Sequence, residues 1–287
     1  VIIAKGSIVD GSAGPGSIAG DDFVKLVRKA YKDETVKALV LRVDSGGGSA
    51  YASEVIADEL EKFRNSGRPI IASMGGVAAS GGYYISTPAD KILAERHTIT
   101  GSIGVGGFIP TFERALEYIG INEDGVSTVD ITTSVAESLT EKDKALLQMG
   151  TDLVYEKFIS KVADNRGVTK EEIDDIARGK VWIGSKALEI GLIDEIAGID
   201  RAIELAAELA EINDEELGVK RINRDTNIDS FFSGMMANIS SSIIKITGLD
   251  FFYKKNGIMN EIEESLNELS MLNDPNGIYM KCFCELD

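Results

Sequence analysis

Three glycine-rich segments hold the residues whose types and spacing could do chemistry, and the middle one is built around Ser80. Its sequence is Met74-Gly75-Gly76-Val77-Ala78-Ala79-Ser80-Gly81-Gly82-Tyr83-Tyr84. Small neighbours allow a substrate backbone to approach the Ser80 hydroxyl, and the Gly81 N–H could face the same side, as at nucleophile sites. The alternative is that Ser80 only caps a helix and that the small residues permit close helix packing.

The first and third segments offer backbone and hydroxyl donors. The first is Asp44-Ser45-Gly46-Gly47-Gly48-Ser49, whose glycines can point several N–H groups into one small volume, as an anion or a developing oxyanion requires. A flexible loop is the other interpretation, and a phosphate loop matches poorly because no Gly-Lys-Ser/Thr follows. The third runs from Thr100 to Gly107, and its Ser102 could hydrogen-bond a catalytic group or belong to a structural turn.

Few histidines and cysteines are available as a base or as zinc ligands. His97 is the only histidine, which excludes a two-histidine metal motif and leaves one histidine that could pair with Ser80. It stands in Ala94-Glu95-Arg96-His97-Thr98 between two expected strands, so we interpret it as a turn or surface residue. Two cysteines are too few for a four-ligand zinc site. We therefore expect no metal and no cofactor.

Alternating strands and helices must position these segments. Apolar and β-branched runs predict strands over residues 1–4, 38–43, 70–74, 92–94 and 99–105. Apolar residues at helical spacing predict helices over residues 21–32, 52–65 and 140–165, with Asp21 and Thr140 as N-caps. This alternation predicts an α/β fold of parallel, right-handed β-α units.

Composition limits the domain organisation and the partners. The chain has 287 residues, 44% of them hydrophobic, which is typical of a globular protein of one large or two small domains. A net charge of −17 repels phosphate backbones and makes nucleic acid an unlikely partner. No apolar run reaches the roughly 18 residues of a membrane span. A composition shift divides the chain into a domain over residues 1–212 and a C-terminal extension over 213–287, where residues 230–252 could form a helix on a membrane, on a neighbouring subunit or on the core.

Taken together, the motifs resemble the signal peptide peptidase A family, also called protease IV. The motifs that carry the resemblance follow one another in order along the chain: Leu41-Arg42-Val43-Asp44-Ser45-Gly46-Gly47-Gly48-Ser49, Ser73 to Ser86, Thr100 to Val105, Val181-Trp182-Ile183-Gly184 and Gly191-Leu192-Ile193-Asp194. Gly46 departs from the family, which usually has proline there, so the loop is expected to be less rigid. The tail, Leu272-Asn273-Asp274-Pro275-Asn276 with Tyr279, resembles the end of the long, two-repeat form, and this chain would then be its C-terminal copy.

The resemblance implies a fold, an activity and a place of action. The fold would be a superhelix of β-α units similar to Clp protease and crotonase, with a helical C-terminal extension. The activity would be that of a serine endopeptidase with a serine-lysine dyad, in which Ser80 is the nucleophile, Gly47 and Gly81 form the oxyanion hole and Ser102 orients the lysine. The substrates would be hydrophobic remnants of signal peptides. Homo-oligomers would act at the cytoplasmic membrane, held by an anchor outside this chain, with the catalytic part facing the periplasm or the outside.

The lysine is where this sequence differs from the one-repeat members of the family. Residues 124–133, which correspond to the lysine-bearing stretch, contain no lysine, and Lys142 and Lys144 fall in the solvated start of a helix. The resemblance implies that the N-terminal copy donates the lysine, so that this chain holds half of an active site. A non-catalytic scaffold or peptide-binding half is the alternative. A crotonase-type acyl-CoA enzyme is a third, which the negative charge disfavours. Phe108, Ile109 and Tyr83 are the expected walls of an apolar cleft.

Overall fold

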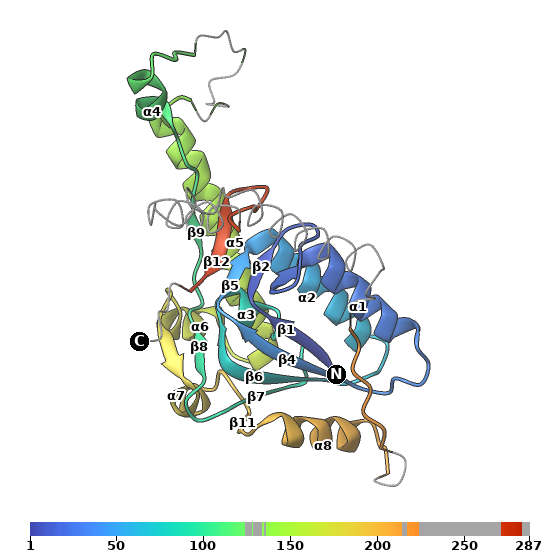
Figure 1. The fold of residues 1–287 in the computed structure, drawn as a ribbon. Coiled ribbons are helices and arrows are strands. Elements are labelled where there is room, and N and C mark those ends of the chain that lie inside the picture. The colour runs from blue at the N-terminus through green and yellow to red at the C-terminus, as the bar shows by residue number, and fades with distance from the viewer. Residues whose placement is uncertain (124–127, 129–133, 135, 214–216, 224–270, 283–287) are drawn as a thin grey trace, which may run out of the picture.

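A parallel sheet lies at the centre of the protein (Figure 1). The computed structural model describes residues 1–123, 128, 134, 136–213, 217–223 and 271–282. Within them, the sheet has the order β1 (Ile2–Lys5), β4 (Leu39–Ser45), β6 (Ile70–Ala79), β7 (Lys91–Ala94) and β11 (Glu195–Ile196), all parallel. The end of β6 also pairs in parallel with β8 (Ile99–Gly101), which pairs with antiparallel β10 (Val181–Ile183). The predicted α/β fold with parallel strands is confirmed.

A second sheet lies beside the first and contains the glycine loop (Figure 1). Its order is β3 (Ser17–Ala19), β2 (Ser7–Val9), β5 (Gly47–Ser49), β12 (Ile278–Lys281) and β9 (Gly106–Gly107). Strand β12 is an exception to the expectation that residues after 212 lie outside the core, because Ile278 and Met280 are buried in the main cluster. The boundary at 212 stays a prediction. So does the helical extension, since residues 230–252 lie outside the described residues.

Helices cover both faces of the central sheet (Figure 1). The helices of the described residues are α1 (Gly20–Lys32), α2 (Ala50–Arg64), α3 (Gly81–Tyr84), α4 (Glu113–Tyr118), α5 (Glu141–Arg166), α6 (Lys170–Ile176), α7 (Gly184–Glu189) and α8 (Ile199–Leu209), and α4 lies away from the sheet. Leu39 and Leu41 of β4 pack in the same cluster as α1 and α2, whereas Val40 packs with α8, as the twofold side-chain period of a strand requires. The predicted N-cap Asp21 is wrong, because α1 begins at Gly20 with Ala19 as the cap, and Asp21 lies in the first turn, where its charge favours the helix dipole.

Helix α5 starts at the predicted Thr140, whose hydroxyl accepts from the Asp143 N–H in a reciprocal capping box. The C-terminal half of α5 is buried against the body through Phe158, Ile159 and Val162. The N-terminal half and α4 extend away from the body, and we call residues 113–118 and 141–153 the arm (Figure 1).

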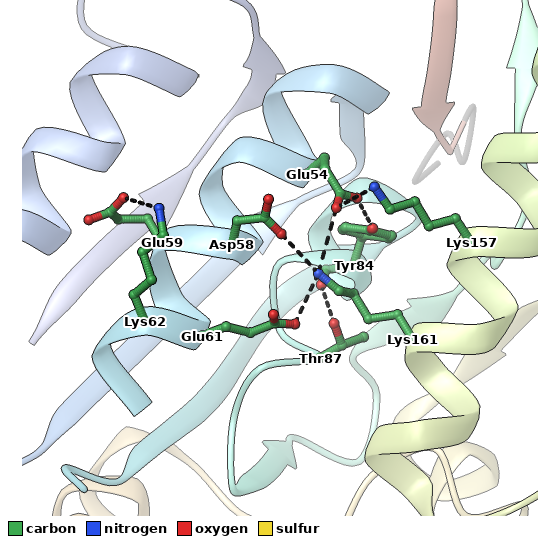
Figure 2. Close-up of polar contacts among 9 residues, drawn as sticks. All are labelled: Glu54, Asp58, Glu59, Glu61, Lys62, Tyr84, Thr87, Lys157 and Lys161. Carbon is green, nitrogen blue, oxygen red and sulfur yellow. Dashed lines mark hydrogen bonds and ion pairs between the residues drawn. The ribbon is translucent and has the colours of Figure 1, made fainter. Parts of the chain in front are cut away.

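An ion cluster fastens α5 to α2 and α3 (Figure 2). Lys161 of α5 lies 3.0 Å from Glu61, 3.4 Å from Asp58 and 3.9 Å from Glu54, all on α2. Lys157 lies 2.7 Å from Glu54, which also accepts a hydrogen bond from the hydroxyl of Tyr84 on α3. We call these six residues the α5 ion cluster.

Candidate active site

Ser80 occupies a strained position at the junction of β6 and α3. Its φ of 54° and ψ of −117° lie in a region that residues other than glycine rarely adopt, and its side chain is only 1% exposed. Its N–H donates to the Gly101 carbonyl at 2.9 Å, which holds the turn. A serine at a sharp strand-to-helix turn is the arrangement of nucleophile elbows, and strain of this kind gathers at functional sites.

The two predicted oxyanion residues, Gly47 and Gly81, lie side by side next to this turn. A Cβ on Gly47 would stand 2.6 Å from the Gly81 nitrogen, and the φ of Gly47 is +92°. Gly81 is the first residue of α3, where a backbone N–H has no intrahelical acceptor. The Gly47 N–H donates to the Ser45 hydroxyl at 3.1 Å, so it would have to exchange that partner to bind an oxyanion.

Ser102 lies on the neighbouring strand at the same level as Ser80. Strands β6 and β8 run parallel with Ala79 opposite Gly101, so the two serines each follow a paired residue. Ser102 is likewise held at a positive φ, of 48°, which is why β8 ends earlier than predicted. The Ser80 hydroxyl lies 3.5 Å from the Gly104 carbonyl. The structure therefore brings Gly47, Ser80, Gly81 and Ser102 to one place.

An apolar cleft of about 1060 Å³ adjoins this group. Ser102 and Gly104 line it together with Tyr155, Tyr279 and Lys281, among others. Of the described lysines only Lys281 lines this cleft, and sequence reasoning missed it because its strand lies 234 positions after its partner Gly47. Another cleft, of about 840 Å³, lies between α8 and the start of β4 and holds none of the predicted site residues.

The bases weighed from the sequence lie away from Ser80. His97 is exposed in the turn before β8, whereas Gly101 beside Ser80 is at the other end of that strand. Lys142 and Lys144 are exposed at the start of α5, and Lys144 pairs with Glu141 at 2.6 Å. These three assignments to the surface are confirmed. Of the stretch 124–133, all but Thr128 lies outside the described residues.

The expected walls of the cleft divide into two kinds. Phe108 and Ile109 are partly exposed, and Phe108 lines both the large cleft and a smaller one of about 380 Å³ that Ile109 also lines. Tyr83 is a wrong prediction, because it is fully buried and its hydroxyl donates to the Leu192 carbonyl at 2.7 Å. Burial raises the pKa of Tyr83, as expected for a phenol inside a core.

None of the helices in the described part of the chain combines the length and the apolar character that a membrane span needs.

Comparison with known proteins identifies a family and several relatives. Residues 62–213 match the family described as Peptidase family S49. The chain is 37% identical to Protease 4 of Haemophilus influenzae and 40% identical to Protease 4 of Salmonella typhi, and each alignment covers 98% of this chain and 46% of the relative. It is 34% identical to the chloroplastic serine protease SPPA of Arabidopsis thaliana over 86% of this chain and 36% of the relative. The chain thus spans less than half the length of these three relatives.

Proposed function

Because this chain belongs to peptidase family S49, a family of serine peptidases, we propose that it is half of an endopeptidase with a serine-lysine dyad and Ser80 as its nucleophile. The observation that carries the proposal is the conformation of Ser80, a buried serine held at positive φ beside Gly47, Gly81 and Ser102. A purely structural serine has no need of that strain.

The proposed reaction is acyl transfer through a covalent ester. The Ser80 Oγ attacks the carbonyl carbon of the scissile peptide bond while its proton passes to a neutral lysine. The Gly81 N–H and the Gly47 N–H, released from Ser45, stabilise the oxyanion. The lysine then gives its proton to the leaving amine. Water, deprotonated by the same lysine, hydrolyses the ester and restores the Ser80 hydroxyl, which takes up that proton.

The lysine would come from an N-terminal copy of the same fold. Residues 124–133 supply none, and Lys142 and Lys144 are exposed. The cleft of about 1060 Å³ beside Ser102 has room for a donated side chain, which the Ser102 hydroxyl would orient. Contact with the apolar lining would lower the pKa of that lysine, as a general base requires. The two Protease 4 relatives are about twice as long as this chain, which leaves length in them for a second copy.

The proposal also includes the substrates, the assembly and the location of the protein. The apolar side chains of Phe108 and Ile109 at the clefts suit hydrophobic peptides such as signal-peptide remnants. The arm exposes apolar side chains that suit contact with the N-terminal copy and with further copies in a homo-oligomer. Action at the cytoplasmic membrane, on its periplasmic or outer side and through an anchor outside this chain, completes the proposal.

A non-catalytic peptide-binding half is the second candidate. Two observations favour it: Ser80 is 1% exposed, and the Gly47 N–H is already bonded to Ser45. In that case the site would bind peptides at the cleft without forming an ester.

Labelling by a fluorophosphonate probe tests the proposal. We expect the chain to label only when the N-terminal copy is added, and Ser80→Ala to label under neither condition. Labelling of the isolated chain would reveal a base within it, and Lys281→Ala would then show whether the lysine of the cleft supplies that base. No labelling of the mixture would favour the non-catalytic candidate.

A further inference from the structure

The C-terminal segment, residues 273–282, lies against the glycine loop from the far end of the chain (Figure 1). Strand β12 is antiparallel to β5, and three pairs are in register: Lys281 with Gly47, Met280 with Gly48 and Tyr279 with Ser49. Beyond the strand, the Cys282 N–H donates to the Gly46 carbonyl at 2.7 Å. The part of the loop from Gly46 to Ser49, which carries the candidate oxyanion donor, therefore has the C-terminal segment as its neighbour.

Asp274 ties this segment to the loop with one oxygen and shapes its own turn with the other. Its Oδ2 accepts from the Ser49 hydroxyl at 2.6 Å and from the Tyr51 N–H at 2.9 Å. Its Oδ1 accepts from the Asn276 N–H at 2.8 Å and from the Ile278 N–H at 3.2 Å. The two oxygens thus serve different parts of the molecule.

Burial of the Asp274 carboxylate at this place is energetically unfavourable. Asp274 is 8% exposed, and none of the ion pairs among the described residues includes it. Burying a carboxylate costs free energy that hydrogen bonds only partly offset. An asparagine could make the same turn through its carbonyl oxygen. The second oxygen is therefore needed only for Ser49 and Tyr51.

We propose that Asp274 is a positioning residue for the oxyanion loop, acting through its Oδ2 bond to Ser49. Gly47 and Gly48 have φ values of +92° and +156°, and glycines have little conformational preference of their own. Neighbouring residues must hold the Gly47 N–H in place, and the bonds of Asp274 fix the end of β5 two residues away. This inference rests on the proposed function in one respect, that Gly47 donates to the oxyanion.

Asp274→Asn separates the two roles of the carboxylate. It can keep the Oδ1 bonds of the turn and replaces the Oδ2 acceptor by an NH₂ group. Asn273→Ala is the matched control, because Asn273 lies in the same turn and, among the described residues, bonds only to the backbone of Asp10, at 2.9 and 3.1 Å. We expect Asp274→Asn to lower the maximal labelling rate about tenfold at unchanged half-saturating probe concentration, with Asn273→Ala within about twofold of wild type.

Hydrogen exchange of residues 46–53 supplies a readout that does not depend on catalysis. Asp274→Asn should exchange these amides faster than Asn273→Ala does, and equal exchange, or labelling at the wild-type rate, would overturn the inference. If Asp274→Asn does not fold, Ser49→Ala removes the same bond from the other end, with the same expectation for labelling. Because the Ser49 hydroxyl also accepts from the Ala52 N–H and caps α2, the exchange comparison for that variant is restricted to residues 46–48. Labelling is measured with the N-terminal copy present. Labelling of Ser80→Ala would contradict the proposed function, while the exchange comparison would still decide the role of Asp274.

Discussion

At position 47 the backbone has no room for a side chain. A Cβ there would stand 2.0 Å from the Met280 carbonyl oxygen and 2.6 Å from the Gly81 nitrogen, at a φ of +92° that alanine rarely adopts. We expect Gly47→Ala to shift the loop away from Gly81 and to reduce probe labelling about a hundredfold, as loss of an oxyanion donor does. The measurement is the labelling rate with the N-terminal copy present.

Gly46→Ala is the control for this substitution. Among the described residues, its Cβ would meet only the Cys282 carbonyl oxygen, at 3.5 Å, which is an ordinary contact. It should therefore label within about threefold of wild type and unfold at nearly the same denaturant concentration. Equal labelling of the two variants would contradict a role of Gly47 in the oxyanion hole.

The residue types predict which segments meet at the site better than they predict the place of each side chain. The glycines around Ser80 and in the 44–49 loop predict that backbone segments approach one another closely there. Such an approach is found between Gly47 and Gly81. The place of Lys281 and the role of Asp274 could not be predicted, because both depend on pairing between segments more than 220 positions apart. An aromatic residue near a nucleophile suits the wall of an apolar pocket, but the Tyr83 side chain is turned into the core, where its hydroxyl bonds to the Leu192 carbonyl.

At the scale of elements, two of the three carboxylates in the α5 ion cluster, Glu54 and Asp58, have pKa values shifted in opposite directions. Figure 2 shows both beside Lys161. Burial alone would raise the pKa of Glu54, but hydrogen bonds from Lys157 and Tyr84 and the charge of Lys161 outweigh it and lower the pKa. Burial and the charge of Glu54 raise the pKa of Asp58 despite its contact with Lys161. The ionised form of Glu54 therefore stabilises the fold, whereas that of Asp58 opposes it.

Glu54→Gln and Asp58→Asn should consequently differ in sign. We expect Glu54→Gln to lower the free energy of unfolding at pH 7 by about 2 kcal/mol, and Asp58→Asn, at a more exposed position, to leave it unchanged or raise it by less than about 0.5 kcal/mol. The stabilisation from a carboxylate with a lowered pKa is present above its ordinary pKa of 4.5 and is lost as the pH falls below it. The difference between wild type and Glu54→Gln should shrink accordingly between pH 5 and about pH 3.

Denaturation followed by the fluorescence of Trp182, the only tryptophan, measures both variants. A Glu54→Gln difference that grows on acidification would be incompatible with the lowered pKa. A loss of stability in Asp58→Asn as large as in Glu54→Gln would be incompatible with the raised pKa of Asp58.

The elements themselves were largely predictable where local signals are strong. Thr140 begins α5 because its hydroxyl and the carboxylate of Asp143 satisfy each other's backbone partners, a signal contained in four residues. The parallel strands of the central sheet follow from apolar runs that alternate with helices. Strand β12 carries a weaker signal, a run of only four residues from Ile278 to Lys281. Its four residues become a strand only because β5 and β9 flank them with open edges, and that is a property of the assembled fold.

At the scale of the whole molecule, the arm extends away from the body and exposes apolar side chains (Figure 1). On α5, Met149 and Leu153 are 67% and 71% exposed and four positions apart, so they lie on one face of the helix. An apolar helix face that extends from the body suits contact with a partner. Within the proposed function, that partner is the N-terminal copy or a second copy of this chain.

Glutamate at both positions should weaken that association without unfolding the chain. Burying two such side chains contributes about 3 kcal/mol, so Met149→Glu with Leu153→Glu should raise the dissociation constant about a hundredfold. Sedimentation of the chain mixed with the N-terminal copy, over a range of concentrations, measures this change. Leu209→Glu is the control, because Leu209 is 46% exposed on α8, away from the arm (Figure 1). Association as tight in the arm variant as in the control would mean that the subunits meet elsewhere, and the arm would then have no part in completing the site.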